Sequence, residues 1–163
     1  MKRLYVKQKA FTMRSQFTVT DENGNLRYTA EGEFWTFGHK LHVYDRYHVK
    51  TGFIKQVVWS WKSRYDVYVD DIYMAQIVRE FTWFKPYYTI HGPGWQLTGN
   101  VLAHEFEVTE NGSVLLNVHK KWMTWGDTYE IEINDVIDER LAVAMVLAID
   151  CVAASQAAAA AAA

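Results

Sequence analysis

Phe34-Trp-Thr-Phe-Gly-His-Lys-Leu-His-Val43 and Trp122-Met-Thr-Trp-Gly-Asp-Thr-Tyr-Glu-Ile131 share one ten-residue pattern, and this pattern decides the fold. In both stretches, Thr and an aromatic residue are followed by three turn-like residues and then by an apolar, a polar and a β-branched residue. The same frame recurs from Ala10, Val58, Phe81 and Gly99, with starts 18 to 24 residues apart. Because self-similarity at such a spacing indicates a structural repeat, we interpret the chain as six units.

Alternation at the end of each unit predicts a strand. The eighth position holds Phe17, Leu41, Tyr65, Tyr88, Phe106 and Tyr129, and the tenth holds Val19, Val43, Val67, Ile90, Val108 and Ile131. The ninth residue, between them, is polar in every unit. Apolar and polar residues alternate in this way in half-buried strands, so the eighth and tenth side chains should point to the core.

A second strand precedes each frame. An apolar residue recurs four positions before it, at Val6, Ala30, Ile54, Ile77, Trp95 and Val118. Asn23-Gly24 and Asn111-Gly112 supply turn signals between units, because type I′ turns need residues that tolerate positive φ. Two strands in each of six units predict a mostly β protein, a closed up-and-down barrel of about twelve antiparallel strands, since closure removes exposed sheet edges.

The C-terminal segment departs from this pattern. The run from Leu141 to Ala154 has no polar stripe, and a helix that is apolar all round is buried in protein or spans a membrane. At about 1.5 Å per residue the run is roughly 21 Å long, close to the height of a barrel. We therefore predict a helix over residues 137–154, buried inside the barrel, with a membrane anchor as the alternative. Asp150 should then need a polar partner or a place at the barrel mouth.

Composition indicates one domain and excludes some functions. We assign residues 1–156 to one domain and leave out the uninformative alanine tail, 157–163. Seventeen basic and nineteen acidic residues give a net charge of −2, which argues against a nucleic-acid binder. The lone Cys151 cannot form an intramolecular disulfide, and Lys7 and Lys9 stand where a signal peptide would be apolar, so we expect a cytoplasmic protein.

The residue patterns typical of catalysis and metal binding are missing from the sequence. His39 and His42 are three apart, which places them on opposite faces of a strand, and the other histidines lack ligand-spaced companions. Cys151 stands in the apolar helix, where a thiol should be neutral and inert. The alternating carboxylates Glu105, Glu107, Glu130 and Glu132 are expected on a solvated outer face. We therefore expect neither an enzyme nor a cofactor or metal site.

Two features favour a binding function. Lys7, Lys9, Lys120 and Lys121 form a candidate site for an anion or lipid headgroup, with ordinary solvated edge charge as the alternative. This site requires the four lysines to converge. Lys7 and Lys9 belong to the first strand and Lys120 and Lys121 to the eleventh, whereas closure places the first strand beside the twelfth.

The second feature is aromatic. The second and fourth frame positions hold Phe11, Trp35, Trp59, Met123, Met13, Phe37, Trp61, Phe84 and Trp125. Strict alternation would point them outward. Because bends are common at barrel rims, we expect them to turn into the core. An exposed aromatic rim is the alternative, and it would indicate contact with a membrane or a partner.

Several stretches give the chain a resemblance to a known family. They are Leu4-Tyr-Val-Lys-Gln-Lys9, Asp21-Glu-Asn-Gly-Asn25, Phe81-Thr-Trp-Phe-Lys-Pro86 and Lys120-Lys-Trp-Met-Thr-Trp-Gly-Asp-Thr-Tyr129, followed by the apolar helix. Over residues 1–154 the chain resembles the LURP-one-related family, whose tubby-like domain is a twelve-stranded barrel around a hydrophobic helix. The resemblance implies a link to lipids, since tubby domains bind phosphoinositides and the related scramblases move lipids. No headgroup-binding residue of tubby matches a position here.

We therefore expect a non-enzymatic, tubby-like barrel that binds anionic phospholipid headgroups or a membrane surface. Two alternatives stay open: a protein-interaction or scaffolding barrel, and an enzyme with a site at one barrel mouth. A basic concavity beside an apolar rim would favour the first function. A compact cluster of His, Asp or Glu at one mouth would favour the enzyme.

Overall fold

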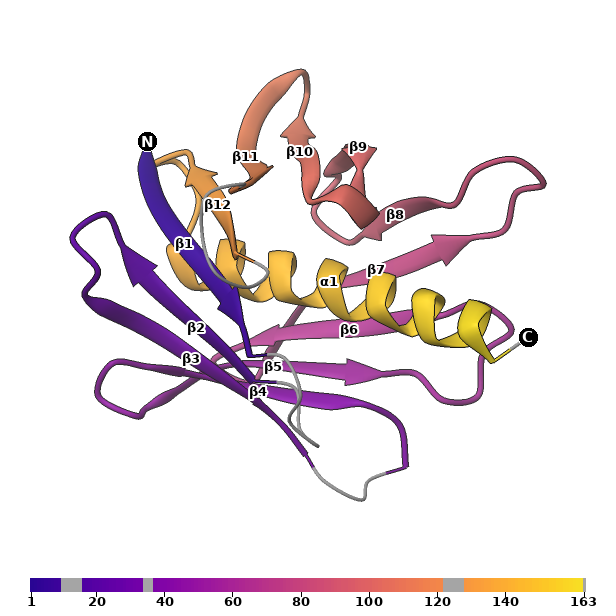
Figure 1. Ribbon diagram of the computed structural model, residues 1–163. Helices are drawn as coiled ribbons and strands as arrows, with labels where there is room; N and C mark the ends of the chain where they lie inside the picture. The colour runs from indigo at the N-terminus through magenta and orange to yellow at the C-terminus, as the bar shows by residue number, and fades with distance from the viewer. Residues whose placement is uncertain (10–15, 34–36, 122–127, 163) are drawn as a thin grey trace.

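The computed structural model describes residues 1–9, 16–33, 37–121 and 128–162. Its strands are β1 (Lys2–Gln8), β2 (Gln16–Asp21), β3 (Leu26–Gly32), β4 (Lys40–Asp45), β5 (Lys50–Gln56), β6 (Arg64–Val69), β7 (Ile72–Glu80), β8 (Tyr87–His91), β9 (Gln96–Asn100), β10 (Glu105–Glu110), β11 (Ser113–Lys120) and β12 (Thr128–Ile133). A short 3₁₀ turn, η1 (Val101–Ala103), precedes β10, and one α-helix, α1 (Glu139–Ala161), follows β12. The strands wrap around the helix (Figure 1).

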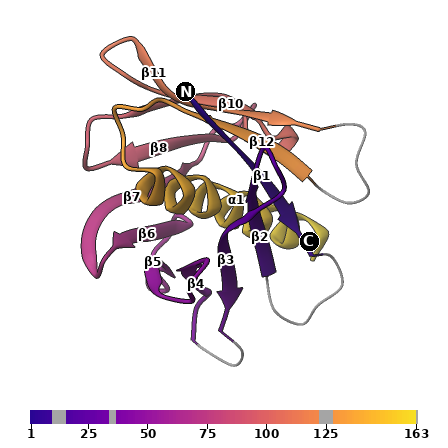
Figure 2. The ribbon, with the colours of Figure 1, turned by 90° about the vertical axis from the view of Figure 1, so that its left-hand side faces the viewer.

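Every strand is antiparallel to its hydrogen-bonded neighbours, in the order β8-β7-β6-β5-β4-β3-β2-β1-β12-β11-β10-β9. The first and last strands pair, with Leu4 opposite Ile131, so the two ends of the β region meet in the middle of the sheet. β8 and β9 stand at the two ends of this order and do not pair with each other. The expected barrel around a helix is confirmed (Figure 2). It is nearly closed rather than closed, because β8 and β9 leave one seam between them.

The repeat frame gives the register of the barrel correctly. All six eighth-position residues and all six tenth-position residues are 8% exposed or less, and the apolar residues of the preceding strands are buried as well. The strand pairing shifts immediately after the tenth position in four units, at Val19, Val43, Val67 and Val108. Because such bulges bend and twist a sheet, their repetition curves the sheet around the helix.

The helix fills the interior. Asp138 caps it by accepting a hydrogen bond from the backbone N of Arg140 at 2.8 Å, and the residues from Leu141 to Ala153 are buried. It begins two residues later than predicted and continues to Ala161, through most of the alanine run. By length and composition α1 could cross a membrane, but 72% of its most apolar window is buried within the protein. It is therefore the core of the barrel, as expected.

Asp150 has the polar partner that its burial requires. Its Oδ1 lies 2.7 Å from Nε2 of His104, the residue that ends η1 with a left-handed φ of 53°. The imidazole of His104 stacks on the ring of Tyr129, with centroids 4.5 Å apart and planes 11° from parallel. A histidine far from the helix in sequence therefore compensates the carboxylate within the core.

Candidate functional site

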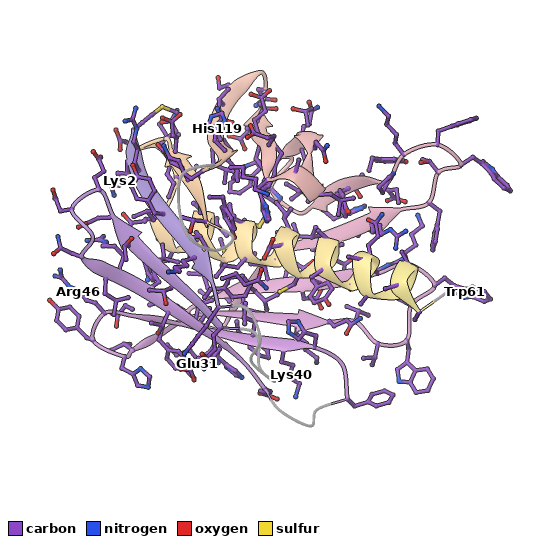
Figure 3. The ribbon with its side chains drawn as sticks, viewed as in Figure 1. Lys2, Glu31, Lys40, Arg46, Trp61 and His119 are labelled. Carbon is purple, nitrogen blue, oxygen red and sulfur yellow. The ribbon has the colours of Figure 1, made fainter. Side chains whose placement is uncertain are left out.

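The two ends of the barrel carry different connections. In an up-and-down sheet, the loops after β3, β5, β7 and β9 share one end, and those after β2, β4, β6, β8, β10 and β12 share the other. The helix begins at the second end and finishes at the first (Figure 1). Trp61 and Arg46 lie at these opposite ends, Trp61 beside the last turns of the helix (Figure 3).

Large aromatic side chains gather at the end where the helix finishes. We define the aromatic rim as Phe37, Trp59, Trp61, Phe81, Trp83 and Phe84, whose exposed fractions run from 66% to 99%. The expectation of core packing is therefore wrong for Phe37, Trp59, Trp61 and Phe84. The interior is already filled by α1, so these side chains stay exposed in the loops at the end of the barrel. Phe11, Met13, Trp35, Met123 and Trp125 lie outside the described residues.

The loops of the aromatic rim are fixed to one another and to the helix. Gly38 has a φ of +86°, and a Cβ there would come within 2.4 Å of Val58, so only glycine allows this approach. Beside it, the rings of Phe37 and Trp59 lie 5.9 Å apart.

Two polar contacts join this end of the barrel to the helix, one from β8 and one from the β5–β6 loop. The hydroxyl of Tyr88 donates to Oε1 of Gln156 at 2.6 Å, and the Oγ atoms of Ser63 and Ser155 are 3.1 Å apart. The β7–β8 loop turns sharply, because the backbone N of Lys85 donates to Thr82 Oγ1 at 3.1 Å. This turn presents Trp83 and Phe84 to solvent.

The two ends also differ in charge. The described loop residues of the aromatic end include Lys9, Lys62, Lys85 and Lys121. They include one carboxylate, Glu33, which pairs with Lys40 at 3.2 Å and with His42 at 2.6 Å. Lys62 pairs with Glu80, whereas Lys9 and Lys85 have no ion pair with any described residue. The loops of the other end, which we name the acidic rim, hold Glu22, Asp70, Asp71, Asp135 and Asp138 against Arg46. All of these carboxylates except Glu22 pair with a cation outside the loops, namely Arg140, Lys50 or the N-terminal amine.

The predicted lysine cluster is only partly brought together. Lys7 pairs with Thr128 across β1 and β12, while the backbone N of Lys121 donates to the O of Thr128 at 3.0 Å. Lys7 and Lys121 therefore lie on opposite sides of β12, so this strand separates their backbones. The ammonium of Lys121 reaches to 5.7 Å from the ring of Tyr5 on β1. Lys9 follows the end of β1, and Lys120 is half-buried on β11.

Glu130 changes the electrostatics of this cluster. It was expected on the solvated face, but it is 6% exposed and lies between Arg3, whose Nε is 3.4 Å from Oε1, and Lys121, which binds Oε2. The hydrogen bond to Glu130 raises the pKa of Lys121, and the negative charge of Glu130 adds a smaller effect in the same direction. An anion at Lys121 would have to compete with this buried carboxylate, which already neutralises the lysine. The four-lysine site stays a prediction.

The aromatic end also contains a pocket beside the helix. We name it the mouth pocket; its volume is about 280 Å³, and it is lined by Gln8, Phe17, His39, Gln56, Tyr65, Asp150, Cys151, Ala154 and Ser155. Burial raises the pKa of the Cys151 thiol well above its ordinary value, so the thiol is protonated and a poor nucleophile, as expected. Within the described ranges, His, Cys, Asp and Glu side chains form no group of three that could hold a metal ion.

Comparison with known proteins identifies the family. The family model described as LURP-one-related matches residues 2–150. The chain belongs to the LURP-one-related family. A relative of this LURP-one-related chain, the uncharacterised protein YxjI of Bacillus subtilis (strain 168), is 28% identical over 149 residues, which cover 91% of this chain and 92% of the relative.

The fold has a counterpart among solved structures. An X-ray structure of a protein from Arabidopsis thaliana superposes with a TM-score of 0.62 at 15% identity, covering 92% of this chain and 91% of that one. At this identity the likeness concerns the fold alone. For this LURP-one-related chain, any function must therefore be argued from its own rim and pocket.

Sequence reasoning identified part of the aromatic end. It singled out Phe37, Trp59, Trp61 and Phe84 but assigned them to the core, and it did not consider Lys62 or Lys85. The strict alternation that predicts the inward columns also predicts outward aromatics, so the signal was present. A helix that already fills the interior leaves no room there for these aromatic side chains, which indicates that they point outward.

Proposed function

We propose that this LURP-one-related barrel is a non-enzymatic protein that binds anionic membrane surfaces through its aromatic rim. One observation carries the proposal: six large aromatic side chains, most of them almost fully exposed, stand on adjacent loops at one end of the barrel. Exposed apolar patches of this kind mark interaction sites, and Trp is enriched where proteins meet the membrane interface. Binding at the cytoplasmic face of a membrane is part of the proposal.

The size of the apolar contribution supports a membrane partner. Withdrawing one Phe-sized side chain from water contributes about 1.5–3 kcal/mol. Trp83 and Phe84 are adjacent at the tip of one loop, so both would enter the interface together. Because rigid loops lose little entropy on binding, the contacts that fix the rim favour partial insertion without rearrangement.

The charge of the same end gives the preference for anionic lipid. Lys9 and Lys85 have no carboxylate partner among the described residues, and each lysine near an anionic surface contributes about 1 kcal/mol. The acidic rim at the far end would then face away from the membrane. The apolar contribution exceeds the ionic one, so we expect binding that salt weakens but does not abolish.

Liposome co-sedimentation tests the proposal. The full chain should sediment with vesicles of phosphatidylcholine and phosphatidylserine, and more weakly with phosphatidylcholine alone. Trp83→Ser/Phe84→Ser should reduce partitioning by roughly tenfold or more, because two apolar groups are lost. The matched control is Tyr47→Ser/Ile72→Ser, which removes two exposed apolar side chains from the opposite end and should change nothing.

Two outcomes contradict the proposal. If the unaltered protein fails to sediment with either vesicle, the rim does not bind membranes and the scaffolding function is favoured. If the control variant loses as much binding as the rim variant, any exposed apolar residue suffices and the aromatic rim has no special role.

A further inference from the structure

The mouth pocket has a chemistry of its own. It lies beside residues 150–155 of the helix and is lined on the barrel side by residues of β1, β2, β5 and β6 and by His39. Its volume of about 280 Å³ is slightly below the roughly 300–1,000 Å³ of sites for drug-sized ligands, so an occupant must be small. Apolar surface from Phe17, Tyr65 and Ala154 alternates there with a few polar groups, as in pockets that bind ligands.

Asp150 supplies the charge of the pocket. The side chain is 8% exposed, and Oδ1 is taken by His104 at 2.7 Å. No described residue donates a hydrogen bond to Oδ2. This oxygen is not one of the buried, unpartnered polar atoms, so it is open to solvent, and a ligand that brings an N–H group to the pocket replaces water at this oxygen.

The other lining residues favour a cation over an anion. Among the described residues no Lys or Arg lines the pocket, and burial lowers the pKa of His39, so that imidazole stays neutral near pH 7. The rings of Phe17 and Tyr65 line the pocket, and aromatic rings attract ammonium groups.

We infer that the mouth pocket binds a small organic amine, with the ammonium group at Asp150 and an apolar body against Phe17 and Tyr65. The inference does not depend on membrane binding, since none of its residues belongs to the aromatic rim. The polar groups of the mouth pocket would bind the amine without reacting with it.

Calorimetric titration with 2-phenylethylamine tests the inference, with 3-phenylpropanoate as an anionic counterpart of similar shape. The full chain should bind the amine with a Kd below about 1 mM and should not bind the carboxylate. Asp150→Asn keeps the side-chain shape and should weaken amine binding at least about tenfold. Thermal melting of each variant verifies that it is folded.

Variants of the helix surface make the test independent of Asp150. Ala154→Phe should fill the pocket and abolish binding, because Ala154 lines it. Ala158→Phe, one turn further along the exposed end of α1, is the matched control and should bind as the unaltered protein does. Absence of amine binding by the unaltered protein overturns the inference. So does equal binding of the carboxylate, or full binding by a folded Ala154→Phe variant.

Discussion

The two rims of this barrel are built on the same strands and differ in nearly everything else. The aromatic rim presents exposed Trp and Phe with lysines, while the acidic rim presents short turns rich in Asp. The acidic rim is also where the helix begins, and there the buried Glu139 binds Arg27 at 2.7 Å, Lys2 at 3.3 Å and the hydroxyl of Tyr28 at 2.9 Å. One end thus fixes the helix through buried charge, and the other leaves apolar surface open to a partner.

The largest effect should come from the interior that both rims share. Ala148→Arg places a charge in the fully buried middle of α1, and it should prevent soluble folding. Ala157→Arg, on the exposed end of the same helix, should be nearly neutral. Soluble yield and circular dichroism measure both. Comparable yields would mean that the barrel does not enclose the helix.

A second prediction compares buried and exposed charge at the two ends. Glu139→Ala leaves Arg27 and Tyr28 without their acceptor and should lower the free energy of unfolding by about 3 kcal/mol. Glu33→Ala, which breaks the more exposed pairs with Lys40 and His42, should cost less than about 1 kcal/mol. Urea denaturation gives both values. If both variants lose a similar free energy of unfolding, the carboxylates of the two ends do not differ in their contribution to stability.

The same carboxylate predicts a pH dependence. Burial raises the pKa of Glu139, but the hydrogen bonds from Arg27 and Tyr28 outweigh burial and hold this pKa below the ordinary value of 4.5. A lowered folded-state pKa gives stability that is present above pH 4.5 and is lost as the pH falls through the folded-state pKa. Glu139→Gln should therefore show a smaller loss of stability than the unaltered protein between about pH 6 and pH 3. Equal losses in urea midpoints would refute the role of Glu139.

The smallest effect separates two sets of lysines. Lys9→Gln/Lys85→Gln should weaken sedimentation with anionic vesicles by about tenfold at low salt, because neither lysine has a carboxylate partner in the described chain. Lys120→Gln/Lys121→Gln should weaken it less, since Glu130 neutralises Lys121. The reverse order would favour the four-lysine site that the sequence suggested, with Lys7 and Lys9 as its other members.

The fold was predictable because its signal repeats. Six copies of one alternation reveal the inward residues even though each copy is short, and the helix stands out by lacking a polar side. Long-range features carried no such signal. His104, the left-handed residue that ends η1, meets Asp150 on the helix. The buried Glu130 pairs with Arg3 on β1 and with Lys121, just after β11. These contacts depend on register between distant segments, which a single sequence does not display.

The seam between β8 and β9 has a consequence for how the chain folds. The covalent ends of the β region, β1 and β12, pair in the middle of the sheet, whereas the unpaired edges of the sheet lie near the middle of the chain. The β1–β12 pairing joins residues about 130 positions apart, such as Arg3 and Glu132, so it carries a large loop-closure entropy. We therefore expect two arrays of hairpins, β1–β8 and β9–β12, to form first. The pairing of β1 with β12, which joins the arrays around the helix, would form last. We expect amide hydrogens on the facing edges of β8 and β9 to exchange faster than those of β1 and β12, because the seam lacks interstrand hydrogen bonds.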